Sequence, residues 1–211
     1  MTTTNKDLRL VTIIGIVVGA LVLVPAANLG VSVTLPIALA SIVGFGVFAA
    51  LALFVLKLLA KRMPIFEQFG KFAAVGTLNT LLNLAVLNAC IAITGIAKGL
   101  PYSGFVVIAF FVATTNSYFW NKFWTFQSTQ PLSAAEYGRF ALFTLCGALL
   151  NVGAATLVVN VIGAPASISA NLWANVGGLA GVAVSFLWNF ISYRRIVFRS
   201  QPQTLNPISN A

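Results

Sequence analysis

The chain has 211 residues, of which 59% are hydrophobic and 7% are charged, and its net charge is +9. This composition excludes an ordinary soluble domain and is typical of multi-span membrane proteins, for which the bilayer is the solvent. The sequence has no histidine, and its two cysteines, Cys90 and Cys146, lie inside apolar runs, so zinc sites and His-based catalysis are excluded. We expect no metal and no cofactor.

The first expected elements are two membrane spans within residues 10–54, a stretch without any charged side chain. Proline, asparagine and glycine between Pro25 and Pro36 are expected to break this stretch into its two helices. Gly15 and Gly19 form a GxxxG pattern, which suits either a homodimer face or close packing against the second span of the same chain. The second use is the commoner one.

A boundary near Pro64 precedes two copies of one pattern. Residues 69–95 align without a gap to residues 137–163, always sixty-eight positions apart. Each copy opens with an aromatic residue, a glycine and a cation, carries an asparagine near its middle (Asn83 or Asn151), and closes on a glycine. We therefore expect a short interfacial segment at residues 64–69 and four further spans, at about 72–94, 101–118, 140–162 and 168–190.

The positions of the cations predict the topology. Six spans place eleven of the twelve Lys and Arg residues on one side and leave Lys98 on the other, which indicates cytoplasmic termini. The predicted fold class is an all-α integral membrane protein with six transmembrane helices, an N-terminal span pair followed by two parallel repeated two-helix hairpins. The predicted domains are a two-span extension (1–64), a four-span domain (65–200, with repeats at about 66–127 and 135–199) and a disordered tail (201–211).

Polar side chains recur on one face of several spans. At 1.5 Å per residue, Asn83 lies about 18 Å from Lys71 along a helix, near the middle of the bilayer. Taken singly, such amides are commonly contacts between helices, worth about 0.6 to 2 kcal/mol each. As a set they suit a polar path for hydroxyl-rich cargo such as a sugar. The candidate path or sugar-binding residues are Asn79, Thr80, Asn83, Asn116, Asn121, Asn151, Asn175 and Asn189.

Cations gather at the cytoplasmic ends of the repeated hairpins. Orientation of the helices by the positive-inside effect accounts for the side on which these cations lie. It does not account for their occurrence at the same sites in both repeats, which suits binding of a lipid phosphate. The candidate lipid-phosphate-binding residues are Lys71, Lys122, Arg139, Arg194 and Arg195. Because no basic face is long enough to follow a phosphate backbone, no nucleic-acid partner is expected.

Residues 66–198 resemble the GtrA-like family of small membrane proteins. The resemblance rests on the aromatic-cation-Phe opening at residues 69–72, VGTLNT at 75–80, NSYFWNKFWTF at 116–126, GRF at 138–140 and NFISYRRIVF at 189–198. It implies movement of a polyprenyl-phosphate-linked sugar across the bacterial plasma membrane, for cell-surface polysaccharide or cell-wall glycosylation. It also implies a membrane glycosyltransferase as partner. The usual pattern of this family has four spans, so the N-terminal span pair is an addition.

Three other functions compete with translocation. A small multidrug exporter needs a carboxylate within a span, and Asp7, Glu67 and Glu136 are all expected to lie outside the spans. An enzyme is disfavoured because no facing acid and base pair is present. A non-transporting anchor for a glycosyltransferase remains open, since an anchor would use the same polar stripes for contacts between helices.

Overall fold

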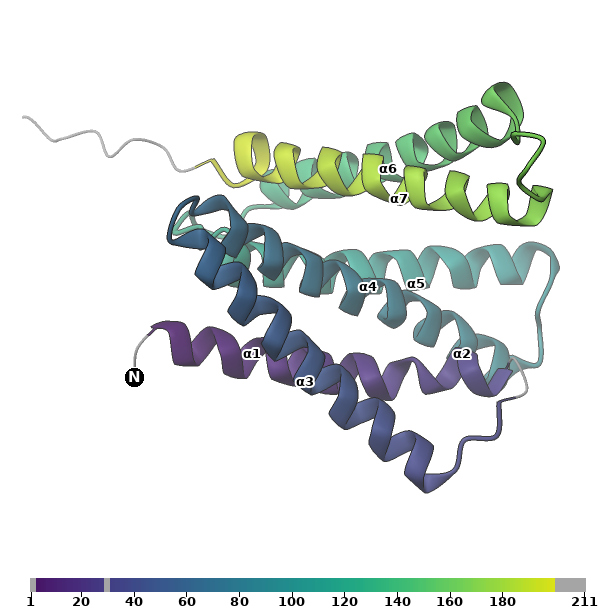
Figure 1. Cartoon of the computed structure of the whole chain (residues 1–211), viewed down its shortest axis with the longest axis horizontal. Coiled ribbons are helices and arrows are strands. Elements are labelled where there is room, and N and C mark those ends of the chain that lie inside the picture. Colours follow the sequence, from purple (N-terminus) through teal and green to yellow (C-terminus); the bar gives the residue numbers. More distant parts are fainter. Residues whose placement is uncertain (1–2, 29–30, 200–211) are drawn as a thin grey trace, which may run out of the picture. The chain divides into compact units, whose positions relative to one another are not determined.

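The computed structural model describes residues 3–28 and 31–199, and these residues form helices joined by short loops (Figure 1). The helices are α1 (Thr3–Leu21), α2 (Leu23–Asn28), α3 (Leu35–Ala60), α4 (Ile65–Thr94), α5 (Gly99–Trp120), η1 (Asn121–Thr125), α6 (Ala134–Thr156), η2 (Leu157–Ile162), α7 (Ala170–Ser192) and η3 (Tyr193–Val197). Within the described residues, six stretches are long and apolar enough to cross a membrane. The predicted all-α membrane protein with six spans is confirmed. The predicted disordered tail lies outside the described residues.

The first span consists of α1 and α2, separated by a turn at Val22. Pro25 has no N–H to donate to the carbonyl of Leu21, and its ring crowds that carbonyl, which explains why α1 ends there. The helix then continues through Pro25 to Asn28. The predicted break therefore begins later than expected, after the proline rather than at it.

The third span is one continuous helix, α4, that begins at Ile65 directly after Pro64. Residues 65–69, expected to form a short interfacial segment before the span, are instead the first turns of the same continuous helix. Whether they lie at the membrane interface stays a prediction. The helix ends at Gly95, whose φ of 71° lies in the left-handed region that glycine adopts without a steric penalty. At 30 residues, α4 is the longest helix of the described chain.

Each repeated hairpin closes in the same way. Both α5 and α7 run into a π-helical turn, in which the N–H of Phe126 donates to the carbonyl of Asn121 at 2.9 Å and that of Phe198 to Tyr193 at 2.8 Å. The last aromatic ring then contacts the phenylalanine that opens the hairpin, with centroids 6.3 Å apart for Phe72 and Phe126 and 5.8 Å apart for Phe140 and Phe198. Matching sequence positions therefore produce matching contacts.

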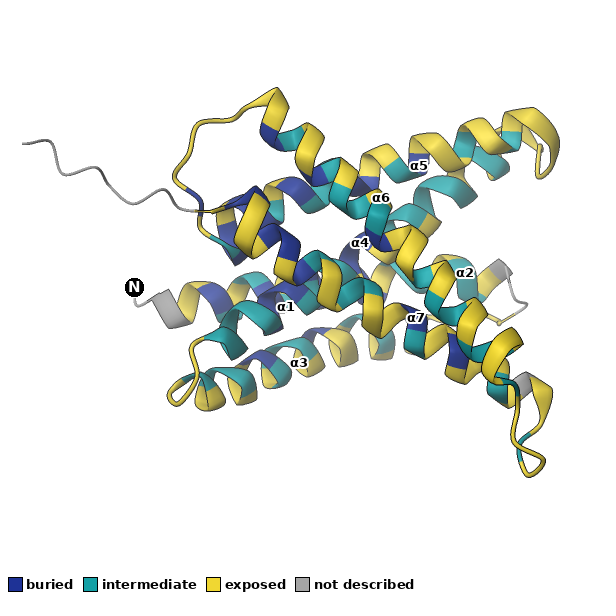
Figure 2. Cartoon of the chain, turned by 90° about the horizontal axis from the view of Figure 1, so that it is seen from above, coloured by how far each residue is buried: buried dark blue, intermediate teal, exposed yellow. Residues whose placement is uncertain are grey.

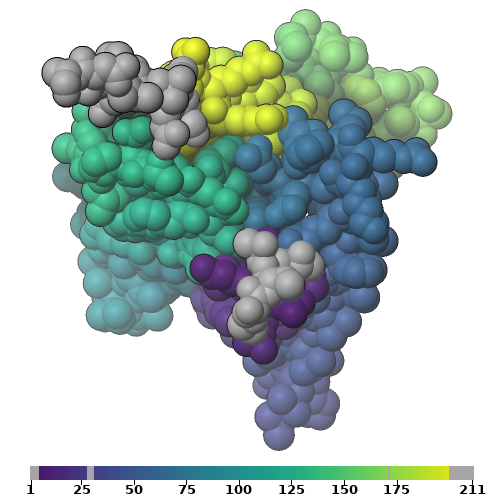
Figure 3. Space-filling model, turned by 90° about the vertical axis from the view of Figure 1, so that its left-hand side faces the viewer, coloured from purple at the N-terminus to yellow at the C-terminus, as the bar shows by residue number. Residues whose placement is uncertain are grey.

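The chain forms two compact units, Met1–Gln127 (unit 1) and Ser128–Ala211 (unit 2). Unit 1 joins the N-terminal span pair to the first hairpin, whereas the sequence suggested a division near Pro64. One buried cluster explains this grouping, because it takes Val11 from α1, Leu53 from α3 and Val75 from α4. The space-filling view shows the start of α1, in purple, beside the blue residues of α3 and α4 (Figure 3).

The GxxxG pattern serves packing within the chain. A Cβ at Gly15 would overlap the carbonyl of Phe45, and one at Gly19 would lie 2.5 Å from the carbonyl oxygen of Ser41. The hydroxyl of Ser41 donates to the carbonyl of Gly19 at 2.8 Å. Only glycine allows α1 and α3 to approach this closely, so this face is occupied inside unit 1.

The outward faces of the helices are mostly exposed (Figure 2). Many of the exposed residues on these faces are large and apolar. Phe48 in α3, Leu149 in α6 and Leu179 in α7 are each about two-thirds exposed or more. Surfaces of this kind are not stable in water but suit contact with lipid tails.

The side of the membrane on which each loop lies stays a prediction, which labelling can test. In a chain whose native cysteines are replaced by alanine, we expect a cysteine at Ala97 to react with an impermeant maleimide on intact cells. A cysteine at Thr129 should react only after the cells are permeabilised. Both positions are exposed, so accessibility of the residue itself does not bias the result. Labelling of Thr129→Cys from outside would contradict cytoplasmic termini.

Candidate functional site

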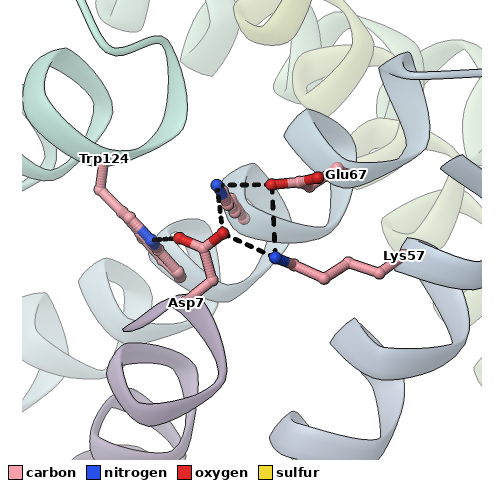
Figure 4. Close-up of polar contacts among 5 residues, drawn as sticks. Asp7, Lys57, Glu67 and Trp124 are labelled. Atoms are coloured by element: carbon pink, nitrogen blue, oxygen red, sulfur yellow. Dashed lines mark hydrogen bonds and ion pairs between the residues drawn. The ribbon is translucent and has the colours of Figure 1, made fainter. Parts of the chain in front are cut away.

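A cluster of charged side chains ties the N-terminal span pair to the first hairpin (Figure 4). The carboxylate of Asp7 accepts from Lys57 Nζ at 2.7 Å, from Lys71 Nζ at 2.9 Å and from the indole N–H of Trp124 at 2.9 Å. Glu67 lies 2.8 Å from Lys71 and 3.6 Å from Lys57. The Lys71 ammonium also stands 5.9 Å from the centre of the Trp124 ring. Two cations and two carboxylates thus balance one another.

This cluster is largely withdrawn from solvent. The Lys71 side chain is 2% exposed and that of Asp7 is 7% exposed, whereas Glu67 is 34% exposed. Burying a charge is costly unless it is paired, so the two carboxylates account for the presence of Lys71 inside unit 1. Lys71, a candidate for binding lipid phosphate, is therefore held by carboxylates of its own chain.

Asp7, Glu67 and Glu136 were expected outside the spans. All three lie in the first turns of helices that are long and apolar enough to cross a membrane, because each helix begins in the polar turn before its apolar run. Their position outside the bilayer core stays a prediction. Asp7 and Glu67 pair with lysines there.

Lys122 is the second buried lysine of unit 1. It lies in the π turn η1 and is fully buried, with its ammonium 5.9 Å from the centre of the Tyr118 ring. Of the five candidate phosphate-binding cations, the two lysines, Lys71 and Lys122, are the buried ones. The remaining three are arginines of unit 2.

The arginines of unit 2 lie at the surface. Arg194 and Arg195 belong to the π turn η3, and together with Arg199 they line one recess. Within the described part of the chain, no carboxylate lies within ion-pair distance of these three guanidiniums. Arg139 is also exposed, and its neighbour Phe140 stacks on Tyr193 with centroids 4.3 Å apart. The start of α6 and the end of α7 therefore carry their cations at the same end of the hairpin.

Sequence reasoning did not include Arg199 in this group. The signal was present in the spacing, because residues 195 and 199 are four apart and a helical or π turn places such residues on one side. The structure shows that Arg199 shares the recess with Arg194 and Arg195.

Polar side chains of the first hairpin lie between α4 and α5. The amide of Asn116 donates to Asn79 Oδ1 at 2.9 Å, and Asn79 donates in turn to the carbonyl of Val75 at 2.7 Å. Thr80 is exposed, and its hydroxyl bonds to the carbonyl of its own helix four residues earlier at 3.0 Å. Asn83 is half-buried and makes no hydrogen bond within the described residues.

Asn121 is buried at the start of η1. Its amide nitrogen donates to the carbonyl and the hydroxyl of Ser117, at 2.9 and 3.2 Å. Its Oδ1 is buried and accepts no hydrogen bond from the described residues. Buried acceptors of this kind are usually satisfied by an ordered water molecule or a ligand.

The second hairpin holds a longer polar ladder between α6 and α7. The hydroxyls of Thr144 and Tyr193 are 2.6 Å apart, and Asn151 donates to Ser185 Oγ at 3.3 Å. Asn189 lies against Gly147, where any Cβ would overlap its amide. The Oδ1 of Asn189 is buried without a donor from the described residues.

Asn175 is exposed on α7, whereas the residues of the ladder are half-buried or buried between α6 and α7. The structure thus brings together Asn79 with Asn116, Asn151 with Ser185, and the three arginines of the recess. Asn83 has the matching place in the first hairpin but no polar partner within the described residues. Whether any of these residues touches cargo stays a prediction.

The sequence was also compared with known proteins. The family described as GtrA/DPMS, transmembrane domain, matches residues 71–198. No curated protein and no solved structure matches the chain significantly. The matched region begins within α4 and ends at Phe198, so it contains the polar residues of both hairpins, Lys71 and two of the three recess arginines, Arg194 and Arg195, and leaves out α1, α2 and α3. Since this match covers more than half of the sequence, the chain belongs to the GtrA/DPMS transmembrane-domain family.

Proposed function

We propose that the protein moves a polyprenyl-phosphate-linked sugar across the bacterial plasma membrane, for cell-surface polysaccharide or cell-wall glycosylation. Membership of the family indicates a membrane role that involves sugar-linked lipids. The observation that supports the proposal is the second hairpin, which carries both an arginine-lined recess at the end of α7 and a ladder of polar side chains between α6 and α7. Such an arrangement suits a ligand with an anionic group beside a polyhydroxyl group.

The recess supplies the chemistry for a phosphate. A guanidinium is planar and always charged, and it binds two oxygens of a phosphate at once. Arg194, Arg195 and Arg199 are exposed and have no carboxylate partner in the described chain, so their donors are available. The phosphate lies where the lipid headgroups lie, at the end of a span.

The ladder supplies the chemistry for a sugar. Twelve residues separate Arg139 from Asn151 in α6, which is about 18 Å at 1.5 Å per residue, roughly half the thickness of the bilayer core. Amides donate and accept hydrogen bonds, as sugar hydroxyls do. The buried Oδ1 of Asn189 is an acceptor that the described residues do not satisfy, and a hydroxyl of the cargo would supply the missing donor.

We propose no chemical step on the cargo. Asp7 and Glu67 are held by lysines and are not available as acid or base. The cargo would come from a membrane glycosyltransferase that acts as the partner of this chain. The same ion pairs disfavour a multidrug exporter, which needs a carboxylate that exchanges protons within a span.

The second candidate is an anchor that binds the glycosyltransferase and transports nothing. The contacts Asn79 with Asn116 and Asn151 with Ser185 favour it, because each joins two helices of one hairpin. Such contacts contribute about 0.6 kcal/mol each in membranes. In an anchor their role would be only to hold the two helices of a hairpin together.

Asn151 and Ser185 offer a test that separates cargo binding from packing. We expect Asn151→Leu to lower transfer of the lipid-linked sugar in reconstituted vesicles several-fold, at unchanged abundance, because the amide is lost while the volume is kept. Ser185→Ala is the matched control, since it removes the same 3.3 Å hydrogen bond and leaves the amide in place. Equal loss of transfer in both variants, in step with lower abundance, would assign Asn151 to packing.

A further inference from the structure

The carboxylate of Asp7 accepts from donor groups on three other elements. Lys57 comes from the end of α3, Lys71 from α4 and Trp124 from η1, and all three donate to this one carboxylate at 2.7 to 2.9 Å. We infer that Lys57, Lys71 and Trp124 form an anion site for a lipid phosphate, and that Asp7 of α1 occupies this site as a competitor within the chain.

The donor set has the chemistry of a phosphate site. Two ammonium groups and an indole N–H converge on two oxygens, as they would on two oxygens of a phosphate. Without Asp7 the cluster would hold two cations and one carboxylate, Glu67, and would carry one positive charge. A buried positive charge with an N–H donor beside it favours an anion over a neutral headgroup.

The site lies within reach of an entering ligand. The Lys57 side chain is 12% exposed and that of Glu67 is 34% exposed, so the cluster extends to the surface of unit 1. Asp7 lies in the first turns of α1, two turns before the close contact of Gly15 with α3. Displacing its side chain therefore does not require α1 to leave α3.

Within the residues that the structure describes, no carboxylate forms an ion pair with the arginines of the second hairpin. The residue that matches Lys71 there is Arg139, which is exposed, and the position that matches Trp124 is Ile196, which has no side-chain donor. The two hairpins thus differ in one respect: the arginine recess is open, and the lysine site is filled by the N-terminal extension. The inference rests on the proposed function only for the identity of the phosphate ligand.

The test uses a chain in which Arg194, Arg195 and Arg199 are glutamine, so that binding at the recess does not mask the result. The full-length chain is placed in phosphatidylcholine nanodiscs and binding of a polyprenyl phosphate is measured. We expect Asp7→Ala to bind this probe about tenfold more tightly or better than the parent, because charge-assisted donors become free. Asp7→Glu, which keeps a carboxylate, should show no gain. Lys71→Met in the Asp7→Ala chain should abolish the gain.

Two controls keep the result decisive. A Cβ at Gly46 would lie 3.0 Å from Ile16 Cγ1, so cysteines introduced at these two positions, after Cys90 and Cys146 are replaced by alanine, are chosen to form a disulfide that holds α1 on α3. No gain in the disulfide-locked Asp7→Ala chain would overturn the inference, as would an equal gain for uncharged polyprenol. The proposed function is judged separately, by transfer in chains with Asp7 intact, so each can fail without the other.

Discussion

Replacing Arg194 and Arg195 together by lysine is expected to reduce transfer of the lipid-linked sugar by roughly tenfold or more, with insertion and abundance unchanged. Hydrogen bonds to charged groups contribute about 1.5 to 3 kcal/mol, and 1.4 kcal/mol corresponds to a factor of ten. A lysine keeps the charge but presents a single point of contact, whereas a guanidinium binds two oxygens. If the two residues only orient the helices, lysine is an equal substitute.

The matched control is Arg62→Lys, because Arg62 follows α3, is exposed and has no ion-pair partner among the described residues. We expect no change for this variant. Arg199→Lys should weaken transfer in the same direction as the double variant, since Arg199 lines the same recess. Full transfer by the Arg194→Lys, Arg195→Lys chain at normal abundance would exclude a phosphate clamp and favour the anchor.

Replacing Lys71 by methionine is expected to destabilise unit 1 by about 3 to 5 kcal/mol, the usual cost of removing one partner from a buried ion pair. Asp7 and Glu67 would then share Lys57 alone, and one carboxylate would remain buried and unbalanced. The measurement is the midpoint of unfolding in mixed detergent micelles.

The repeat provides the control for this prediction. Arg139→Met alters the matching position of the second hairpin, where the side chain is exposed and has no carboxylate partner in the described chain, so stability should not change. The double variant Asp7→Asn, Lys71→Met restores the charge balance and should recover most of the loss. A stability loss of equal size in Arg139→Met would show that the loss in Lys71→Met does not come from breaking its buried ion pairs.

Periodicity and composition were sufficient to predict the spans and the repeat. Apolar runs of membrane length determine where helices form, and the matching positions of residues 69–95 and 137–163 give matching aromatic contacts. The close packing at Gly15 and Gly19 could also be predicted, because two glycines four residues apart in a membrane helix commonly mark a close contact between helices.

The ion cluster could not be predicted from the sequence. Asp7 is 50 residues from Lys57 and 117 from Trp124, and no local pattern links charges over such separations. For this reason Lys71 was grouped with the arginines by its position in the repeat, although burial gives it a different environment. Likewise, the sequence shows that Asn189 is polar but not that it lies against Gly147 with a buried acceptor unmet.

The N-terminal span pair changes how the first hairpin is used. Asp7 of this span pair neutralises Lys71, whereas Arg139, the matching residue of the second hairpin, is exposed. The α3 helix of the span pair contributes Lys57 to the same cluster. The two repeats therefore offer different electrostatic surfaces in spite of their similar sequences. We expect the second hairpin to be the one that first binds the lipid phosphate.

The central claim is that this chain alone moves a phosphate-linked sugar lipid across a bilayer. The direct measurement places the purified chain in vesicles that carry the sugar lipid in one leaflet, without a glycosyltransferase, and follows access of an impermeant sugar-modifying reagent to the other leaflet. The account predicts transfer well above that of empty vesicles, with loss of transfer in the Arg194→Lys, Arg195→Lys chain. Transfer no faster than in empty vesicles, by a chain that still binds its glycosyltransferase, would contradict the account and establish the anchor.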